Sequence, residues 1–245
     1  MSLSAMLGRA RRMGVTLVAA FVFAIGAGAA HAQSTASAAS SVDPLEPFNR
    51  AVFDFNEALD RSVLKPVAET YVKVTPDLFR FLFRNFLSNM VEPWNAVNNL
   101  LQGKPGAAAS DTGRFLINTL LTFGLADPAA EMGLERSNED LGQTLGVWGF
   151  GPGPYLVLPV LGPSSGRDGL GRIADIAYDP SRRIADRGDF AVFTAVRITE
   201  QRASLLSMER LVAGAALDRY SFVRNAYLQR RQNLVYDGNP PEPKE

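Results

Sequence analysis

The chain has 245 residues, no cysteine and one histidine, His31, and its 25 basic and 25 acidic residues give a formal net charge of zero. A nucleic-acid binder would normally show a basic excess, so that class is excluded. Without cysteine, and with only one histidine, neither a Cys–His nor a Ser–His–Asp nucleophile nor a Cys/His zinc site is expected.

Residues 1–32 have the pattern of a secretory signal peptide. Three arginines precede an apolar run over residues 13–30, which ends in the small-x-small site Ala30-His31-Ala32. We expect cleavage after Ala32, followed by a flexible spacer over residues 33–42, and an uncleaved membrane anchor is the alternative. Cleavage removes three arginines and no acid, which leaves 22 basic and 25 acidic residues and a net charge of −3.

Successive helices are expected from Asp43 onward. Asp43 and Glu46 form a D-x-x-E capping box, with Pro44 in the first turn. The next apolar residues recur at spacings of four, three and four, which predicts one helical stripe: Phe48, Val52, Phe55 and Leu59. Pro66 is expected to interrupt this helix, and a second piece should end near Val74.

A phenylalanine-rich helix should follow, starting at Thr75-Pro76-Asp77. Apolar residues cover nearly its whole circumference: Leu78, Phe79, Phe81, Leu82, Phe83, Phe86 and Leu87. Such a helix lies either at the centre of a large core or against lipid. Burying four phenylalanines contributes on the order of 8–12 kcal/mol, so they should not face water. Glu92-Pro93-Trp94 is expected to end the helix and to place an indole where a membrane interface favours one.

The remaining sequence predicts more helices and no sheet. Helices are expected over 95–102 (closed by Gly103), 111–123, a short turn from Asp127-Pro128, 138–145, 165–177 (capped by Ser165 and ended by Asp179-Pro180), 190 to about 216, and 218–235. No alternating pattern longer than four residues, internal repeat or ATP-binding loop occurs. We therefore expect an all-α domain over residues 43–237 and a disordered tail over 238–245.

The stretch from Leu141 to Gly166 has no charged residue and is rich in glycine and proline. Prolines remove backbone donors and glycines loosen the chain, so no regular hydrogen-bond ladder is expected there. Its side chains are nevertheless apolar, and irregular apolar backbone is tolerated where it is buried or lines a cavity. It either plugs a soluble core or forms the wall of a passage for an apolar ligand.

Several blocks, in order, resemble the MlaA/VacJ family over essentially the whole chain after the spacer. They are DPLEPFNR (43–50), NFLSNMVEPWNAVNNLLQGKP (85–105), GRFLINTLLTFGLADPA (113–129), DLGQTLGVWGFGPGPYLVLPVLGPSSGRDGLG (140–171), TEQRASLL (199–206) and FVRNAYLQRRQNLVYDG (222–238).

The resemblance implies an all-α, ring-like domain around an amphipathic channel in the outer membrane of a Gram-negative bacterium. It implies intermembrane phospholipid transport: mislocalised phospholipids leave the outer leaflet and pass to a soluble periplasmic carrier, with a trimeric porin as partner. No enzymatic activity, cofactor or metal is expected. Many family members carry lipid on a cysteine, and the absence of cysteine predicts a chain that is not a lipoprotein.

The family's channel-side loop falls on the apolar stretch. We expect the channel to be lined by Trp148, Phe150, Tyr155, Leu156, Val157, Leu158, Val160 and Leu161. Arg167 and Asp168 are the first charges after the stretch and suit a rim that contacts lipid headgroups, with a local ion pair as the alternative. Membrane contact is expected from Phe79, Phe83, Phe86 and Trp94.

Two other functions fit parts of the sequence. A soluble periplasmic lipid-binding protein could close a private cavity with the same apolar stretch. An envelope hydrolase could use a carboxylate pair from Glu131, Glu135, Glu139 and Asp140, although a solvated acidic turn explains these residues better.

Overall fold

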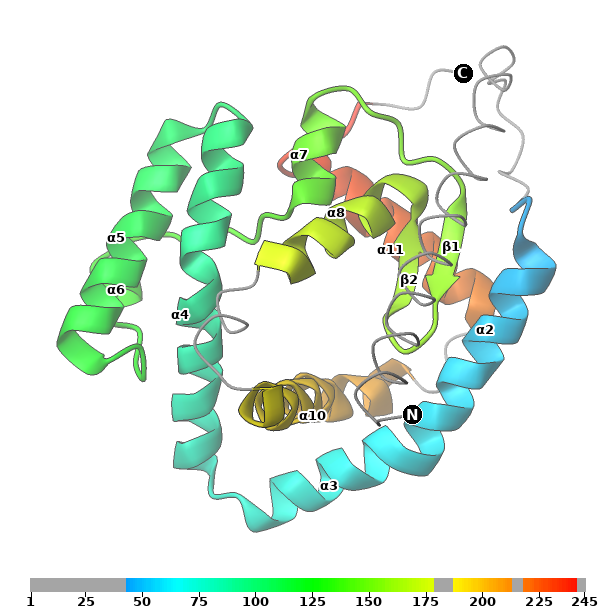
Figure 1. Cartoon of the computed structure of the whole chain (residues 1–245), viewed down its shortest axis with the longest axis horizontal. Coiled ribbons are helices and arrows are strands. Elements are labelled where there is room, and N and C mark those ends of the chain that lie inside the picture. Colours follow the sequence, from blue (N-terminus) through cyan, green and yellow to red (C-terminus); the bar gives the residue numbers. More distant parts are fainter. Residues whose placement is uncertain (1–42, 179–186, 213–217, 242–245) are drawn as a thin grey trace, which may run out of the picture. The chain divides into compact units, whose positions relative to one another are not determined.

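A computed structural model describes residues 43–178, 187–212 and 218–241. The predicted signal peptide, the spacer and residues 242–245 of the predicted tail lie outside this range. The described part consists of helices and one two-stranded antiparallel sheet (Figure 1). The all-α class is therefore confirmed, with a small β-hairpin that the sequence did not predict.

The first helical segment is continuous where a break was expected at Pro66. Helix α2 (Glu46–Leu59) runs through a π-helical segment, η2 (Asp60–Leu64), into α3 (Lys65–Val74). Pro66 lies in the first turn of α3. The π segment widens the helix just before Pro66 and accommodates it. The proline lacks an N–H group, but the chain stays helical.

The predicted capping role of Asp43 is present in part. Its carboxylate accepts from the Leu45 amide (3.0 Å), but α2 itself begins later than predicted, with Leu45 as its N-cap. Asp43 is buried and accepts hydrogen bonds from the Asn49 side chain (3.0 Å) and from the Tyr220 hydroxyl. Its carboxylate therefore joins the start of α2 to the C-terminal helix.

Helix α4 (Asp77–Leu101) continues through Pro93, where the sequence predicted an end. Proline weakens a helix interior because it cannot donate to the preceding turn. Here side chains on both sides of the proline bond to neighbouring elements, Glu92 to Arg114 (3.1 Å) and Asn99 to Asp111 (2.8 Å). These tertiary bonds hold the helix together across the weakened turn.

Helix α5 (Pro105–Thr122) packs along α4, and the short α6 (Pro128–Glu131) follows it (Figure 1). Helix α5 starts before the predicted Asp111, because Pro105 fits its first turn. Asp127 caps α6 by accepting from the Ala130 amide, as the sequence predicted.

The remaining elements are α7 (Leu141–Val147), β1 (Tyr155–Leu158), β2 (Gly162–Ser165), α8 (Gly166–Tyr178), α10 (Arg187–Val212) and α11 (Arg219–Val235). The predicted Ser165 cap of α8 is present, since its hydroxyl accepts from the Asp168 amide (3.2 Å). Asp218 caps α11 in the same way through Tyr220. The predicted Asp179-Pro180 helix end lies outside the described residues.

Contacts between elements form a closed circuit. Helix α2 contacts β1 and continues through η2 into α3, which packs on α10. Helix α10 contacts α4, α4 contacts α7, α7 packs on α8, and α8 returns to the hairpin. This circuit agrees with the expected ring at the level of contacts, while the channel stays a prediction.

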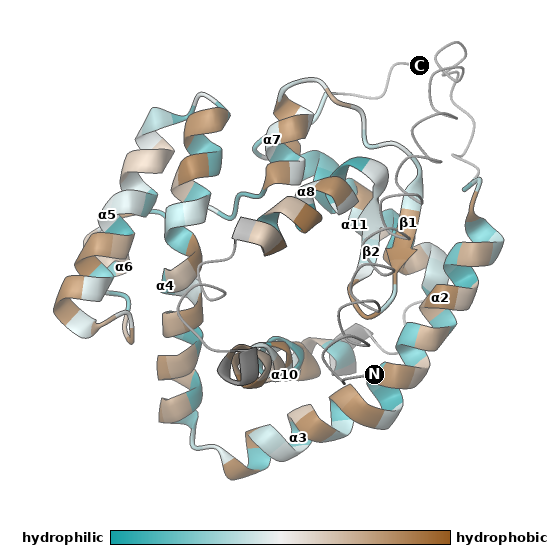
Figure 2. Cartoon of the chain, in the orientation of Figure 1, coloured by the Kyte–Doolittle hydropathy of each residue, from teal (hydrophilic) through white to brown (hydrophobic). Residues whose placement is uncertain are grey.

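The distribution of polarity is reversed relative to an ordinary soluble core. Among the described residues that are buried, sixteen are polar or charged and ten are hydrophobic, five of them alanines. Large apolar side chains are exposed on nearly every helix, and Figure 2 shows the apolar and polar colours alternating along them. Buried polar groups and exposed apolar patches are the informative exceptions to normal burial, so this body is built for an apolar environment.

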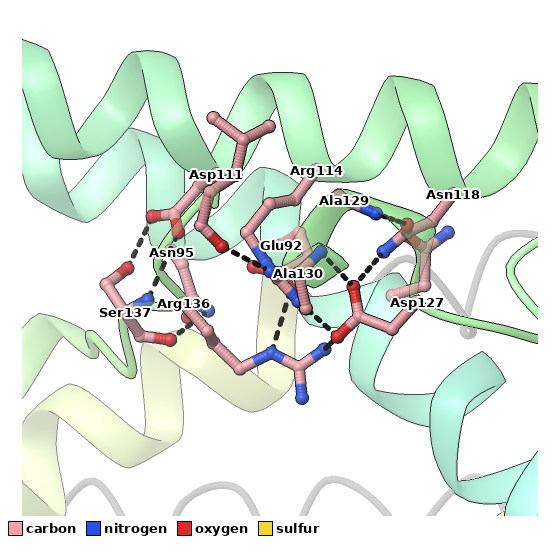
Figure 3. Close-up of polar contacts among 12 residues, drawn as sticks. Glu92, Asn95, Asp111, Arg114, Asn118, Asp127, Ala129, Ala130, Arg136 and Ser137 are labelled. Carbon is pink, nitrogen blue, oxygen red and sulfur yellow. Dashed lines mark hydrogen bonds and ion pairs between the residues drawn. The ribbon is translucent and has the colours of Figure 1, made fainter. Parts of the chain in front are cut away.

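The clearest case is the polar contact between α4 and α5, which we call the polar seam: Asn89, Glu92, Asn95 and Asn99 of α4 with Asp111, Arg114 and Asn118 of α5, all buried. At its centre Arg114 donates to Glu92 (3.1 Å), to the Leu134 carbonyl (2.7 Å) and to Asp127 (2.6 Å) (Figure 3). Burial alone would raise the pKa of Asp127, but hydrogen bonds from Arg114 and Asn118 lower it. The seam therefore holds its charges in place by mutual compensation.

We expect Arg114→Met to destabilise the protein by about 3 kcal/mol or more, because it removes the buried cation from Glu92 and Asp127. Arg136→Met is the matched control, since Arg136 contacts the same two carboxylates with a side chain that is 39% exposed, against 1% for Arg114. The control should cost about 1 kcal/mol or less. Denaturant unfolding of the detergent-solubilised proteins measures both, and equal losses would contradict a buried central role for Arg114.

Candidate functional site

The apolar stretch after α7 folds into a β-hairpin rather than an irregular loop, so the expectation of no regular ladder is wrong. Strand β1 pairs antiparallel with β2, with Leu156 opposite Ser164 and Val157 opposite Pro163. The Val157 amide donates to Asn49 (2.9 Å), and Pro163 has no amide hydrogen to donate. The proline therefore occupies a pair that exchanges no N–H bond, where its missing donor costs the ladder nothing.

Two asparagines of α2, seven residues apart, hold the hairpin from outside. Asn49 donates to the Tyr155 carbonyl (3.0 Å) and accepts from the Val157 amide (2.9 Å). Asn56 donates to the Leu158 carbonyl (3.0 Å) and accepts from the Val160 amide (2.8 Å). Each amide side chain thus engages one donor and one acceptor of the hairpin backbone, as a third strand would. Asparagines two turns apart on an otherwise apolar helix face were the signal that sequence reasoning missed.

The eight predicted lining residues fall into two groups. Tyr155, Leu156 and Val157 are buried, and Leu158 is half-buried. The other four are exposed by half or more: Trp148, Phe150, Val160 and Leu161. The lining role of both groups stays a prediction.

The buried group anchors the hairpin. Tyr155 and Val157 form a cluster with Tyr220 of α11, against which Phe53 of α2 and Tyr227 of α11 pack. The Tyr155 and Tyr220 rings meet edge to face, with centroids 6.2 Å apart. The exposed group lies at the two ends of the stretch, next to α7 and in the hairpin loop, and is free to contact an apolar ligand.

The predicted rim residues belong to a buried ionic network. Arg167 pairs with Asp168 at 3.0 Å, and Asp168 also accepts from Arg231 (3.0 Å) and from the Tyr227 hydroxyl (2.7 Å). Arg231 in turn makes a bidentate contact with Asp140. Their headgroup role stays a prediction, and both predicted rim charges already have protein partners.

This network fixes charge states as well as positions. Burial would raise the pKa of Asp168, but the Arg231 charge and the Tyr227 hydrogen bond lower it. The pKa of Asp140 is lowered in the same way by Arg231 against the effect of burial. Because Asp140 caps α7, Asp168 lies in the first turn of α8 and Arg231 belongs to α11, the network joins three helices behind the hairpin.

The predicted membrane contacts differ in exposure. Phe79 is 62% exposed, as are its neighbours Leu78 (63%) and Phe81 (51%). Phe83 packs edge to face on Phe193 of α10 (6.3 Å), and Phe86 is half-buried. Trp94 is half-buried and donates to Asp175 (2.8 Å). A central core position for the whole phenylalanine-rich helix is thus wrong, since its first turns face outward.

A second exposed apolar surface, missed from the sequence, surrounds the end of α5. It consists of Leu116, Leu120, Leu121, Phe123 and Met132, with Phe123 80% and Leu120 76% exposed. Phe123 ends α5 in the left-handed conformation, with φ of 54°. No helix of the described part is long and apolar enough to cross a membrane.

The acidic residues before α7 show no paired arrangement that favours the hydrolase alternative. Asp140 is bound to Arg231, and Glu139 accepts from Gln102 (2.8 Å). Glu131 and Glu135 are exposed. Within the described ranges, no group of three or more histidine, cysteine, aspartate or glutamate side chains could hold a metal ion.

Comparison with known proteins identifies the family. The model of the MlaA lipoprotein family matches residues 41–234. The chain belongs to the MlaA lipoprotein family. It is 36% identical over 208 residues to the "Intermembrane phospholipid transport system lipoprotein MlaA" of Escherichia coli, covering 83% of this chain and 82% of the relative.

Two further MlaA comparisons agree. The protein of that name from Haemophilus influenzae is 31% identical over 237 residues, which cover 94% of each chain. A solved structure described as "Structural basis for maintenance of bacterial outer membrane lipid asymmetry" superposes with a TM-score of 0.70 at 38% identity. The match covers 79% of this chain and 99% of that one.

The ionic network of Asp140, Asp168 and Arg231 should make the stability of the folded protein depend on pH. The pKa values of Asp140 and Asp168 are lowered in the folded protein, so their contribution is present above the ordinary carboxyl pKa of about 4 and is lost as pH falls below it. We expect Asp168→Asn to lower the Tm at neutral pH and to reduce its further fall in acid. Thermal unfolding from about pH 7 to about pH 3 tests this. The exposed Glu131→Gln should keep the wild-type slope, and an unchanged slope for Asp168→Asn would contradict the network's role.

Proposed function

We propose that this protein is an outer-membrane component of intermembrane phospholipid transport. The observation that carries the proposal is the reversed polarity of the body, with polar groups packed between helices and large apolar side chains outward. Membership of a family whose relatives are named for phospholipid transport supports it. We propose no enzymatic step, because Asp140 caps α7 and pairs with Arg231, and Glu139 pairs with Lys104.

The protein is proposed to lie within one leaflet rather than to span the bilayer. Helices with an apolar outer face lie in the interface plane, and the helices described here are too short or too polar to cross. The two apolar surfaces, around Phe79 at the start of α4 and around Leu120 at the end of α5, are the proposed lipid contacts. The half-buried Trp94, farther along α4, is a weaker contact.

A lipid path must shield acyl chains from water. At roughly 0.8 kcal/mol per CH₂, two chains of about 15 carbons cost about 24 kcal/mol to hydrate. The proposed path runs along the hairpin and its flanking segment, with Trp148, Phe150, Val160 and Leu161 as the groups that contact the lipid. Tyr155 and Val157 would support this wall from behind, because they pack on α2 and α11.

The wider setting follows from the resemblance. We propose that the chain is exported, with cleavage after Ala32, and that a trimeric porin and a soluble periplasmic carrier are its partners. With no cysteine in the chain, membrane attachment is assigned to the apolar helix faces and to the porin. The competing function is a soluble periplasmic lipid-binding protein.

The double variant Phe79→Asp/Leu120→Asp should move the protein from the membrane to the soluble fraction. Each charge placed in hydrocarbon costs roughly 2.5–3.5 kcal/mol, and both side chains are exposed, so the fold should tolerate the change. Phe79→Leu/Leu120→Met is the matched control and should stay in the membrane. Retention of the Asp variant would refute the lipid-facing assignment. A wild-type protein that leaves the membrane without detergent would favour the soluble alternative.

The path is tested with two charges placed in the hairpin. Leu161 is 50% exposed and Val157 is 1% exposed, so Leu161→Asp should keep the wild-type Tm while Val157→Asp should lose several kcal/mol of stability. In cells whose own copy is replaced, Leu161→Asp should raise outer-leaflet phospholipid to the level of a deletion strain. A folded, membrane-located Leu161→Asp protein that clears surface phospholipid normally would refute the path. A deletion strain with normal surface phospholipid would refute the function.

A further inference from the structure

A cation of α8, Arg172, is bonded to the hairpin loop. Arg172 of α8 donates from Nη1 to the Leu161 carbonyl (3.0 Å), the last residue of the loop between the two strands. A guanidinium has five N–H donors, so one bond to a carbonyl leaves most of its donors free. The bond lies at an exposed position.

Arg172 differs in its charge partners from Arg167, five residues earlier. Arg167 forms an ion pair with Asp168, and the Arg167 side chain is 9% exposed. Within the described part of the chain, no carboxylate lies at ion-pair distance from Arg172. Its hydrogen bond is to a neutral carbonyl, and its guanidinium keeps N–H groups that can bind an anion.

The two carboxylates nearest to Arg172 along α8, Asp168 and Asp175, are bound to other groups, and the exposed side chains around the cation are apolar. Val160 and Leu161 of the loop are 54% and 50% exposed, and on α8 Leu170, Ile173 and Ile176 are exposed by 50%, 52% and 38%. Ile176 lies four residues after Arg172 and therefore on the same side of the helix. Figure 2 shows the loop and the C-terminal turns of α8 in the apolar colours.

The loop is held in a strained conformation that keeps these side chains outward. Val160 has φ of 67°, a left-handed conformation that a β-branched residue rarely adopts. The Asn56 side chain fixes it by accepting from the Val160 amide (2.8 Å). Strain of this kind persists only where surrounding bonds impose it, and it concentrates at ligand-binding sites.

We propose that Arg172, the hairpin loop and the outer face of α8 form a binding site for a glycerophospholipid. The free N–H groups of Arg172 bind the phosphodiester, and Val160, Leu161 and Ile176 contact the acyl chains next to it. An unpaired cation bordered by apolar side chains matches a ligand whose anion and acyl chains are joined within a few bonds. This inference rests on the proposed function and moves headgroup recognition from Arg167 to Arg172.

The test is lipid binding by the full chain in non-ionic detergent, measured by native mass spectrometry. The probes are phosphatidylglycerol and a diacylglycerol with the same acyl chains. Wild type should bind phosphatidylglycerol more tightly, and Arg172→Gln should lose about tenfold for that lipid and nothing for diacylglycerol. Arg172→Lys should retain part of the difference. The exposed Arg230→Gln on α11 is the matched control and should bind both as wild type does.

The outcomes separate this site from the function. Phosphatidylglycerol binding that is unchanged in Arg172→Gln, at an unchanged Tm, overturns the site and leaves the proposed function standing. Displacement of the lipid by inorganic phosphate at millimolar concentration overturns the acyl-chain part and indicates a simple anion site. Two results together overturn the proposed function itself: the purified wild-type protein binds neither lipid, and deletion of its gene leaves surface phospholipid normal.

Discussion

The arrangement of the body depends on the contact between Arg114 and Glu92, two charges that are almost completely inaccessible between α4 and α5. A buried ion pair is costly unless further bonds satisfy its partners. Here Arg114 also bonds Asp127 and the Leu134 carbonyl, and Arg136 joins it on Oε1 of Glu92, while Oε2 of Glu92 is buried with no partner among the residues that the structure describes. Because these two helices turn their polar faces toward each other, their apolar faces must point outward. The exposed apolar side chains are more numerous than a water-soluble surface normally carries, which favours an apolar environment for these helices.

The same principle recurs where the circuit of helices closes. Arg202 of α10 makes a bidentate contact with Asp60 (2.6 and 2.8 Å) at the π-helical segment η2, and Arg231 joins α7, α8 and α11 through Asp140 and Asp168. Bidentate guanidinium–carboxylate contacts fix orientation as well as distance, which apolar packing does less well. These polar contacts join the helices while many large apolar side chains stay exposed.

Local signals in the sequence predicted most helices, and long-range bonds account for the misses. The caps at Asp127 and Ser165 were correct because a cap is decided within one turn. Pro93 and the hairpin were misjudged because their outcome depends on partners far along the chain, such as Asn49, 108 residues before Val157. For the candidate site, adjacent charges allowed the local ion pair of Arg167 and Asp168 to be named as an alternative, and the structure contains it. The sequence could not divide buried anchors from exposed residues along the apolar stretch, since burial there depends on packing against α2 and α11.

The hairpin keeps apolar side chains exposed although no third strand in the described part of the chain pairs with its open edge. An open strand edge exposes unpaired N–H and C=O groups, to which another chain can pair. Asn49 and Asn56 instead satisfy the outer backbone groups of the hairpin, and Pro163 occupies a pair that needs no donor. Side-chain amides cover the edge while leaving the loop free, so Val160 and Leu161 stay exposed beside Arg172. The hairpin's backbone is thus bonded by the amides of Asn49 and Asn56, while its exposed apolar surface is formed by other side chains, Val160 and Leu161.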